Sequence, residues 1–166
     1  MIDKIQVFVH RSDWRAGSLV GPGWLDRLLA ALADPRHGLA GPSTNRSWNE
    51  QRAFPSCADS SDAIAATARE AELRFGGAVR PLAPLHSLAD FCYAVRRDVI
   101  DAVGEADEEY GLGPCWEMDY NVRAARAGFL GVWVGAAYVH RGAFTPAAAS
   151  RSRAASRRAS AATNIT

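Results

Sequence analysis

An acidic motif between residues 116 and 123 contains the clearest candidates for chemistry in this sequence. The motif reads Trp-Glu-Met-Asp-Tyr-Asn-Val-Arg, and its carboxylates belong to Glu117 and Asp119. A carboxylate within hydrogen-bond reach of a hydroxyl group can act as a general base, so both are candidate catalytic residues. A structural role competes with this interpretation, because carboxylates are stabilised at the start of a helix and Asp119 can pair with Arg123 one turn later.

A polar segment from Asn45 to Gln51 offers groups of a different kind. It reads Asn-Arg-Ser-Trp-Asn-Glu-Gln. Amide and carboxylate groups form hydrogen bonds with hydroxyls, and an indole ring can stack on the face of a pyranose, so the segment suits a sugar. A surface loop anchored by one tryptophan is an equally good interpretation. The candidate substrate-binding residues, two of them from the acidic motif, are Asn45, Trp48, Asn49, Glu50, Gln51, Trp116 and Arg123.

His140 is the candidate metal ligand. It comes directly after the apolar stretch GVWVGAAYV, which is typical of a β-strand. A histidine at the end of a strand can bind a metal, although a single histidine is more often hydrogen bonded within the protein or exposed at its surface. The other histidines, His10, His37 and His86, are scattered along the chain and show no ligand spacing.

The elements that must position these residues are short strands alternating with helices, an order that predicts an α/β layered fold. In the last predicted helix, Met118, Val122, Ala125 and Phe129 follow helical spacing. The predicted strands cover residues 5–10, 38–41, 88–95 and 131–140. The predicted helices cover residues 24–34, 62–75, 96–103 and 116–129, and Ser60 or Ser61 is the predicted cap of the second.

Composition narrows the class of protein. The 166 residues fit one domain, and 48% apolar with 22% charged residues predicts a packed core. A net charge of +1 gives no reason to expect a nucleic acid or an anionic membrane as partner, and no apolar run is long enough for a transmembrane segment. Three cysteines without a CxxC pair indicate a reducing, cytoplasmic location.

Taken in order, these motifs resemble those of family 2 glycosyltransferases. The segment GPGWLDRLLAALADPRHGLAGPSTN resembles the part of that family that follows its metal-binding acidic motif. LADFCYAVRRDVIDAVG, the acidic motif, RAARAGF and a strand ending in Val-His resemble its later part. The likeness runs from about Val20 to Phe144, so we interpret residues 20–146 as a partial family 2-like domain. Residues 1–19 are an atypical N-terminal segment, and the Ala/Ser/Arg-rich residues 147–166 are expected to be a disordered tail.

The resemblance implies a partial GT-A fold, a Rossmann-like three-layer α/β sandwich with a mixed sheet. It also implies a hexosyltransferase-type reaction, in which a sugar passes with inversion from a nucleoside-diphosphate donor to a hydroxyl of a glycan, lipid or protein acceptor. Counted back from Gly128, Glu117 takes the position of the family's catalytic base and Asp119 its second acidic position. A divalent Mg²⁺ or Mn²⁺ ion would neutralise the leaving diphosphate, and His140 matches a histidine that binds this metal in some members.

The resemblance does not extend to the nucleotide-binding end of the family. Its metal-binding acidic motif would fall just before Gly21, where residues 15–20 read Arg-Ala-Gly-Ser-Leu-Val without a carboxylate, and Asp13 is out of register. The alternative interpretation is therefore a non-catalytic remnant, or an acceptor-binding module that lacks donor-site residues. An incomplete sheet would leave an edge and apolar faces open, which predicts self-association into a homo-oligomer.

Overall fold

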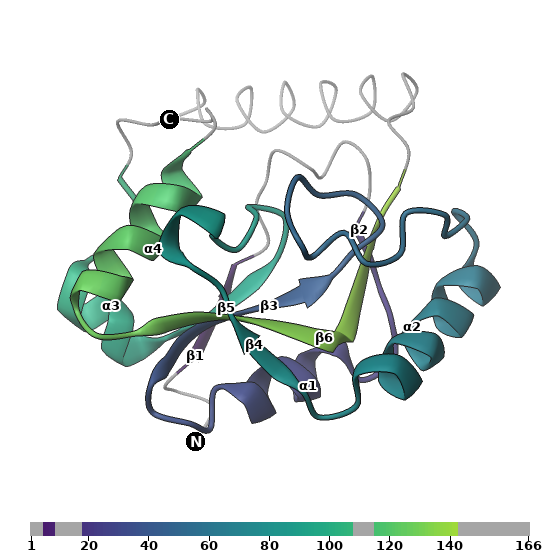
Figure 1. The fold of residues 1–166 in the computed structure, drawn as a ribbon, viewed down its shortest axis with the longest axis horizontal. Coiled ribbons are helices and arrows are strands. Elements are labelled where there is room, and N and C mark those ends of the chain that lie inside the picture. Colours follow the sequence, from purple (N-terminus) through teal and green to yellow (C-terminus); the bar gives the residue numbers. More distant parts are fainter. Residues whose placement is uncertain (1–4, 9–17, 108–114, 143–166) are drawn as a thin grey trace, which may run out of the picture.

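The computed structural model describes residues 5–8, 18–107 and 115–142 of the chain (Figure 1). Asp13 and the proposed tail at residues 147–166 lie outside these ranges, so the expectations that concern them stay predictions. The strands of the described residues are β1 (Ile5–Phe8), β2 (Ser18–Val20), β3 (His37–Ser43), β4 (Val79–Pro81), β5 (Tyr93–Arg96) and β6 (Leu130–Arg141). The helices are α1 (Trp24–Ala31), α2 (Ser61–Phe75), α3 (Arg97–Val103) and α4 (Trp116–Arg126), with a 3₁₀ turn η3 at Pro84–His86.

The strands form one mixed, curled sheet. Their order is β1-β5-β3-β6-β2, and β4 also pairs with β6. Within the described sheet, β3 and β6 run parallel to each other, and the other pairs are antiparallel. These pairings confirm the predicted α/β class and the mixed sheet.

The long strand β6 gives the sheet its curl. The first part of β6 pairs with β4, and its last residues pair with β2. Opposite β3, the register jumps from Val134, the partner of Pro42, to Tyr138, the partner of Ser43. The extra residues bend β6, as Figure 1 shows, and Ser43 Oγ donates a 2.7 Å hydrogen bond to the carbonyl of Gly135 at the bend.

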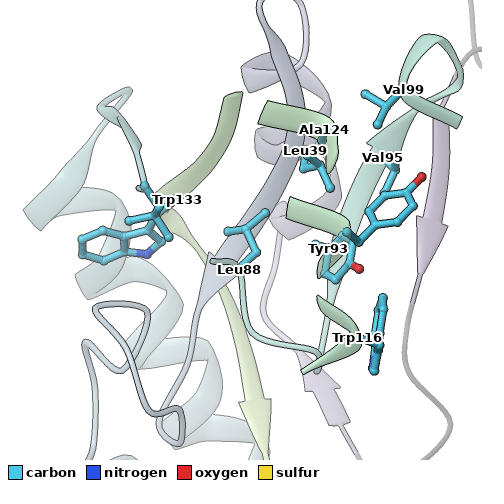
Figure 2. Close-up of a cluster of buried hydrophobic side chains, with 10 residues drawn as sticks. Leu39, Leu88, Tyr93, Val95, Val99, Trp116, Ala124 and Trp133 are labelled. Atoms are coloured by element: carbon cyan, nitrogen blue, oxygen red, sulfur yellow. The ribbon is translucent and has the colours of Figure 1, made fainter. Parts of the chain in front are cut away.

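Helices cover both faces of this sheet. Neighbouring residues of a strand point to opposite faces, so adjacent residues belong to different apolar clusters. On one face, Leu39 and Val95 belong to a cluster with Trp116 and Tyr120 of α4 (Figure 2). On the other face, the adjacent Ala40 and Ala94 meet α1 through Leu28 and Leu32.

One predicted strand is shorter than expected. Strand β5 begins at Tyr93, whereas the sequence predicts a strand from Leu88. The apolar residues before Tyr93 form a buried loop, and the amide of Ala89 in this loop donates to the side chain of Gln51 rather than to a neighbouring strand. The apolar composition of residues 88–92 therefore reflects their burial and not pairing with another strand.

The predicted helix after residue 115 is present as α4, and its buried side is not the one marked by the apolar spacing. The helix buries Trp116, Glu117, Tyr120, Asn121 and Ala124, and not the face that contains Met118, Val122 and Ala125. Phe129 lies beyond the end of α4 and packs at the margin of the cluster. The aromatic rings of Trp116 and Tyr120 belong to the buried cluster, and they mark the side of the helix that faces the sheet.

Candidate functional site

The first turn of α4 carries the acidic motif and buries its first carboxylate. Cys115 precedes the helix with a φ of 87°, the left-handed region, and the chain then enters α4. Trp116 stacks on Tyr93 of β5, with ring centroids 5.8 Å apart and planes 28° apart. Glu117, the next residue, is only 6% exposed. The start of α4 thus holds a carboxylate against the end of the sheet, beside two aromatic rings.

The surroundings of Tyr93 act on the pKa of its hydroxyl group. Its pKa lies well above the usual value, first because burial disfavours the phenolate, and then because the charges of Tyr120, Glu117 and Asp90 oppose it. Arg123 acts in the opposite direction. Glu117 is therefore close enough to Tyr93 for its charge to be felt, and Tyr93 stays a neutral hydroxyl at ordinary pH.

Asp119 lies on a different side of the helix from Glu117 and forms an ion pair. Its Oδ2 is 2.8 Å from Nε of Arg123, one turn further along. The guanidinium of Arg123 also donates to the carbonyl oxygens of Val103, at 2.6 Å, and Glu105, at 3.1 Å. Arg123 therefore joins α4 to the end of α3. The catalytic role of Asp119 and the substrate-binding role of Arg123 stay predictions, and both groups already have structural partners.

The segment from Asn45 to Gln51 contains amides that hold the loop to the rest of the fold. Gln51 is fully buried; its Nε2 donates to Pro42 O at 2.8 Å, and its Oε1 accepts from the amide of Ala89 at 2.7 Å. Asn45 exchanges two hydrogen bonds with the backbone of Arg141, at 2.8 and 3.0 Å. These two side chains fix the loop and present no free amide face to a ligand.

Asn49 completes the same set of contacts, whereas its two neighbours face outward. Nδ2 of Asn49 donates to the carbonyl of Ser87 at 2.6 Å and to Oε1 of Gln51 at 3.1 Å. Trp48 is 56% exposed. Glu50 is partly exposed, and its Oε1 lies 3.5 Å from Nδ1 of His86. Of the five candidates in this loop, Trp48 is exposed and Asn49 and Glu50 are partly exposed. The amide of Asn49 is already used in hydrogen bonds within the protein.

His140 sits inside a hydrogen-bonded chain. The residue is fully buried, with Nε2 2.6 Å from Oδ1 of Asp59 and Nδ1 3.0 Å from the hydroxyl of Tyr138. Both ring nitrogens are thus occupied, and a metal ion would have to displace one of these partners. Within residues 18–107 and 115–142, no three His, Cys, Asp or Glu side chains are grouped to hold a metal. The described residues do not fit a divalent ion as they stand, so the metal role of His140 stays a prediction.

Three partners of the candidate residues were missed in the sequence. Tyr138 and His140 are two apart on one strand, so their shared side of β6 follows from strand periodicity. Asp59 and His86 carry no such signal, because Asp59 is 81 positions from His140 and His86 meets Glu50 only through the folding of two loops.

Comparison with known proteins finds no match for this chain among protein-family models, curated protein sequences or solved structures. The likeness to family 2 glycosyltransferases therefore rests on the motifs of the sequence alone. Within the described part of the chain, no helix is both long and apolar enough to cross a membrane. The cytoplasmic location stays a prediction.

Proposed function

We propose that this chain is the acceptor-side part of an inverting, family 2-like glycosyltransferase of the GT-A fold. Glu117 is the proposed base, and the donor is a nucleoside-diphosphate sugar. The observation that carries the proposal is the burial of Glu117 at the start of α4. Removing a carboxylate from water costs free energy, and such groups gather at functional sites because burial tunes their basicity.

The reaction is a single displacement at the anomeric carbon. The acceptor oxygen attacks this carbon while the bond to the diphosphate oxygen breaks, and the diphosphate leaves with the electron pair. Glu117 takes the proton of the acceptor hydroxyl. Trp116 and Tyr93 stack on each other, and their proposed role is to limit the access of water, which competes with the acceptor.

A transfer assay with matched variants tests the assignment of the base. The full chain is incubated with uridine, guanosine and thymidine diphosphate sugars, Mn²⁺ and a panel of glycan acceptors, and the nucleoside diphosphate and the glycosylated product are measured. Replacing Glu117→Gln keeps the size of the side chain but removes the base, so turnover should fall about 10²–10⁴-fold. Glu70→Gln on the exposed side of α2 is the control and should leave turnover unchanged.

The alternative is an acceptor-binding module without donor chemistry. Two observations favour it. Both ring nitrogens of His140 already contact Asp59 and Tyr138 at hydrogen-bond distance. Residues 15–20 contain no carboxylate. Calorimetry with the same donors and Mn²⁺ separates the two readings. Donor binding that is lost in Asp13→Ala or His140→Gln supports the transferase, whereas the absence of heat with every donor supports the module. Within the transferase proposal, wild-type turnover in Glu117→Gln would refute the assigned base.

A further inference from the structure

We infer that Trp48, Glu50 and His86 form a platform that binds a neutral pyranose unit of the acceptor. These residues come from two segments, the loop after β3 and the turn η3. The inference rests on the proposed function only in calling the sugar an acceptor, because binding itself needs no donor. It adds His86, which no motif indicated, and it names the class of ligand.

The first argument is the exposure of Trp48. Trp116 and Trp133 are buried, whereas Trp48 leaves 56% of its surface in water. Burial of an aromatic side chain contributes about 1.5–3 kcal/mol, so this exposure forgoes stability that the fold obtains from the buried tryptophans. A large exposed aromatic surface of this kind is typical of binding sites rather than of inert loops.

The second argument is the rigidity of the loop that presents the indole. The amide of Thr44 donates to the carbonyl of Gln51 at 2.7 Å, and Ser47 Oγ donates to Asn49 Oδ1 at 2.8 Å. Asn49 in turn donates to the carbonyl of Ser87, beside η3. Hydrogen bonds therefore surround Trp48 on both sides along the chain. A ligand that stacks on its ring meets a group that is already ordered, which lowers the entropy cost of binding.

The third argument is the polar pair beside this loop. Glu50 and His86 lie 3.5 Å apart, and two thirds of the His86 side chain is exposed. The pKa of Glu50 is lowered, first by a hydrogen bond from its own backbone amide, and further by His86 and Arg80. The carboxylate thus stays charged and accepts hydrogen bonds from sugar hydroxyls, while the imidazole can donate one.

The charges of the platform suit a neutral ligand. The positive charge of Arg80 acts on the negative charge of Glu50, so the two offset each other and the site has no single sign that would attract a phosphate or a cation. Leu85, in the same turn as His86, is also exposed, at 65%. A hexose has an apolar C–H face for the indole and hydroxyls for Glu50 and His86.

Binding of simple sugars to the full chain tests the platform. The probes are methyl α- and β-glycosides of glucose, galactose, mannose and N-acetylglucosamine, together with cellotriose and maltotriose. Binding is followed by saturation-transfer NMR and by the shift of the indole N–H signal of Trp48, with no donor present. The wild-type chain should bind at least one probe, and Trp48→Ala should weaken that binding about tenfold.

Matched variants decide the outcome. Leu73→Ser changes another strongly exposed apolar side chain, on α2, and should bind as the wild type does. Glu50→Gln and His86→Ala should each weaken binding without loss of folded structure, because both side chains reach solvent. If no probe binds, or if Trp48→Ala binds like the wild type, the platform is refuted. Sugar binding without any transfer would refute the proposed enzyme but not the platform. Transfer that is unaffected by Trp48→Ala would refute the platform but not the proposed enzyme.

Discussion

Burial protects the thiols of this protein unequally. Cys92 is 1% exposed, and burial raises its pKa to about 12, whereas Cys115 is exposed in front of α4. Only thiolates react readily with alkylating agents, so iodoacetamide at pH 8 should modify Cys115 in the folded protein and spare Cys92. Mass spectrometry of the digested protein measures both sites. Guanidinium should make Cys92 reactive, and equal labelling of the two thiols before unfolding would contradict the described burial.

Two neighbouring carboxylates, Glu117 and Asp119, end in different environments. Sequence reasoning could predict that residues two apart on a helix point to different sides, roughly 200° around the axis. It could not predict which of them would be buried, because that depends on Tyr93, a residue of β5 that stacks on Trp116. The burial of Glu117 therefore follows from contacts between segments far apart in the chain.

The amides of the loop after β3 show the same limit. Asn45, Asn49 and Gln51 were predicted to bind sugar hydroxyls, and in the fold their amides bind backbone groups. An amide has the same donors and acceptors for either partner, so composition cannot separate the two roles. The hydrogen-bond partners in the fold separate them instead, and they leave Trp48 and Glu50 as the members of the loop whose side chains do not hold it in place.

The contact between β6 and α2 depends on a glycine at the bend of the strand. A Cβ atom at Gly135 would lie 2.5 Å from Cγ of Phe75, the last residue of α2. The ring of Phe75 also packs edge-on against Trp133, at 5.2 Å, so it has little room to move. Gly135→Ala should therefore lower the free energy of unfolding by about 1–3 kcal/mol, measured by urea denaturation.

Gly77→Ala is the matched control for this substitution. Gly77 follows α2, has open space where a Cβ would lie, and is not in the left-handed region of φ. Alanine there restricts the unfolded chain without a clash, so the free energy of unfolding should be unchanged or up to about 1 kcal/mol higher. If Gly135→Ala were as stable as Gly77→Ala, the close approach of β6 and α2 would be wrong.

Local signals predicted the longer elements and missed the short ones. Helix α2 was recognised from its cap, and Ser60 Oγ indeed accepts from the amide of Ala63 at 3.3 Å. Strands β2 and β4 have three residues each and were not predicted. Both exist because β6 offers them paired backbone groups on one side, and no periodicity can develop over so few residues.

Among the described residues, no further strand pairs with the outer edges of β1 and β2. Strands β1 and β2 end the main strand order, and Leu19 and Val20 of β2 are about half exposed. An open edge with apolar side chains favours association, so the homo-oligomer stays a prediction that this arrangement supports. The GT-A fold likewise stays a prediction, since the described sheet establishes the mixed α/β class and its curl.

Buried phenols should make the fold unstable in alkali. The pKa values of Tyr93, Tyr120 and Tyr138 are all raised, in each case mainly because burial disfavours the phenolate. A group whose pKa is raised by folding contributes its full stability below the unfolded pKa, near 10 for tyrosine, and loses it as the pH rises further. The unfolded chain then releases protons that the folded chain retains.

The free energy of unfolding should therefore fall above about pH 10, by up to about 1.4 kcal/mol per pH unit for each retained proton. Urea denaturation between pH 8 and 11 measures the slope, and the absorbance of tyrosinate reports whether ionisation accompanies unfolding. Tyr93→Phe removes one of these protons and should make the slope shallower, with little change in the shape of the site. A stability that stays level from pH 9 to 11 would mean that water reaches these phenols, and the described core would then be too loose to hold Glu117 beside Tyr93.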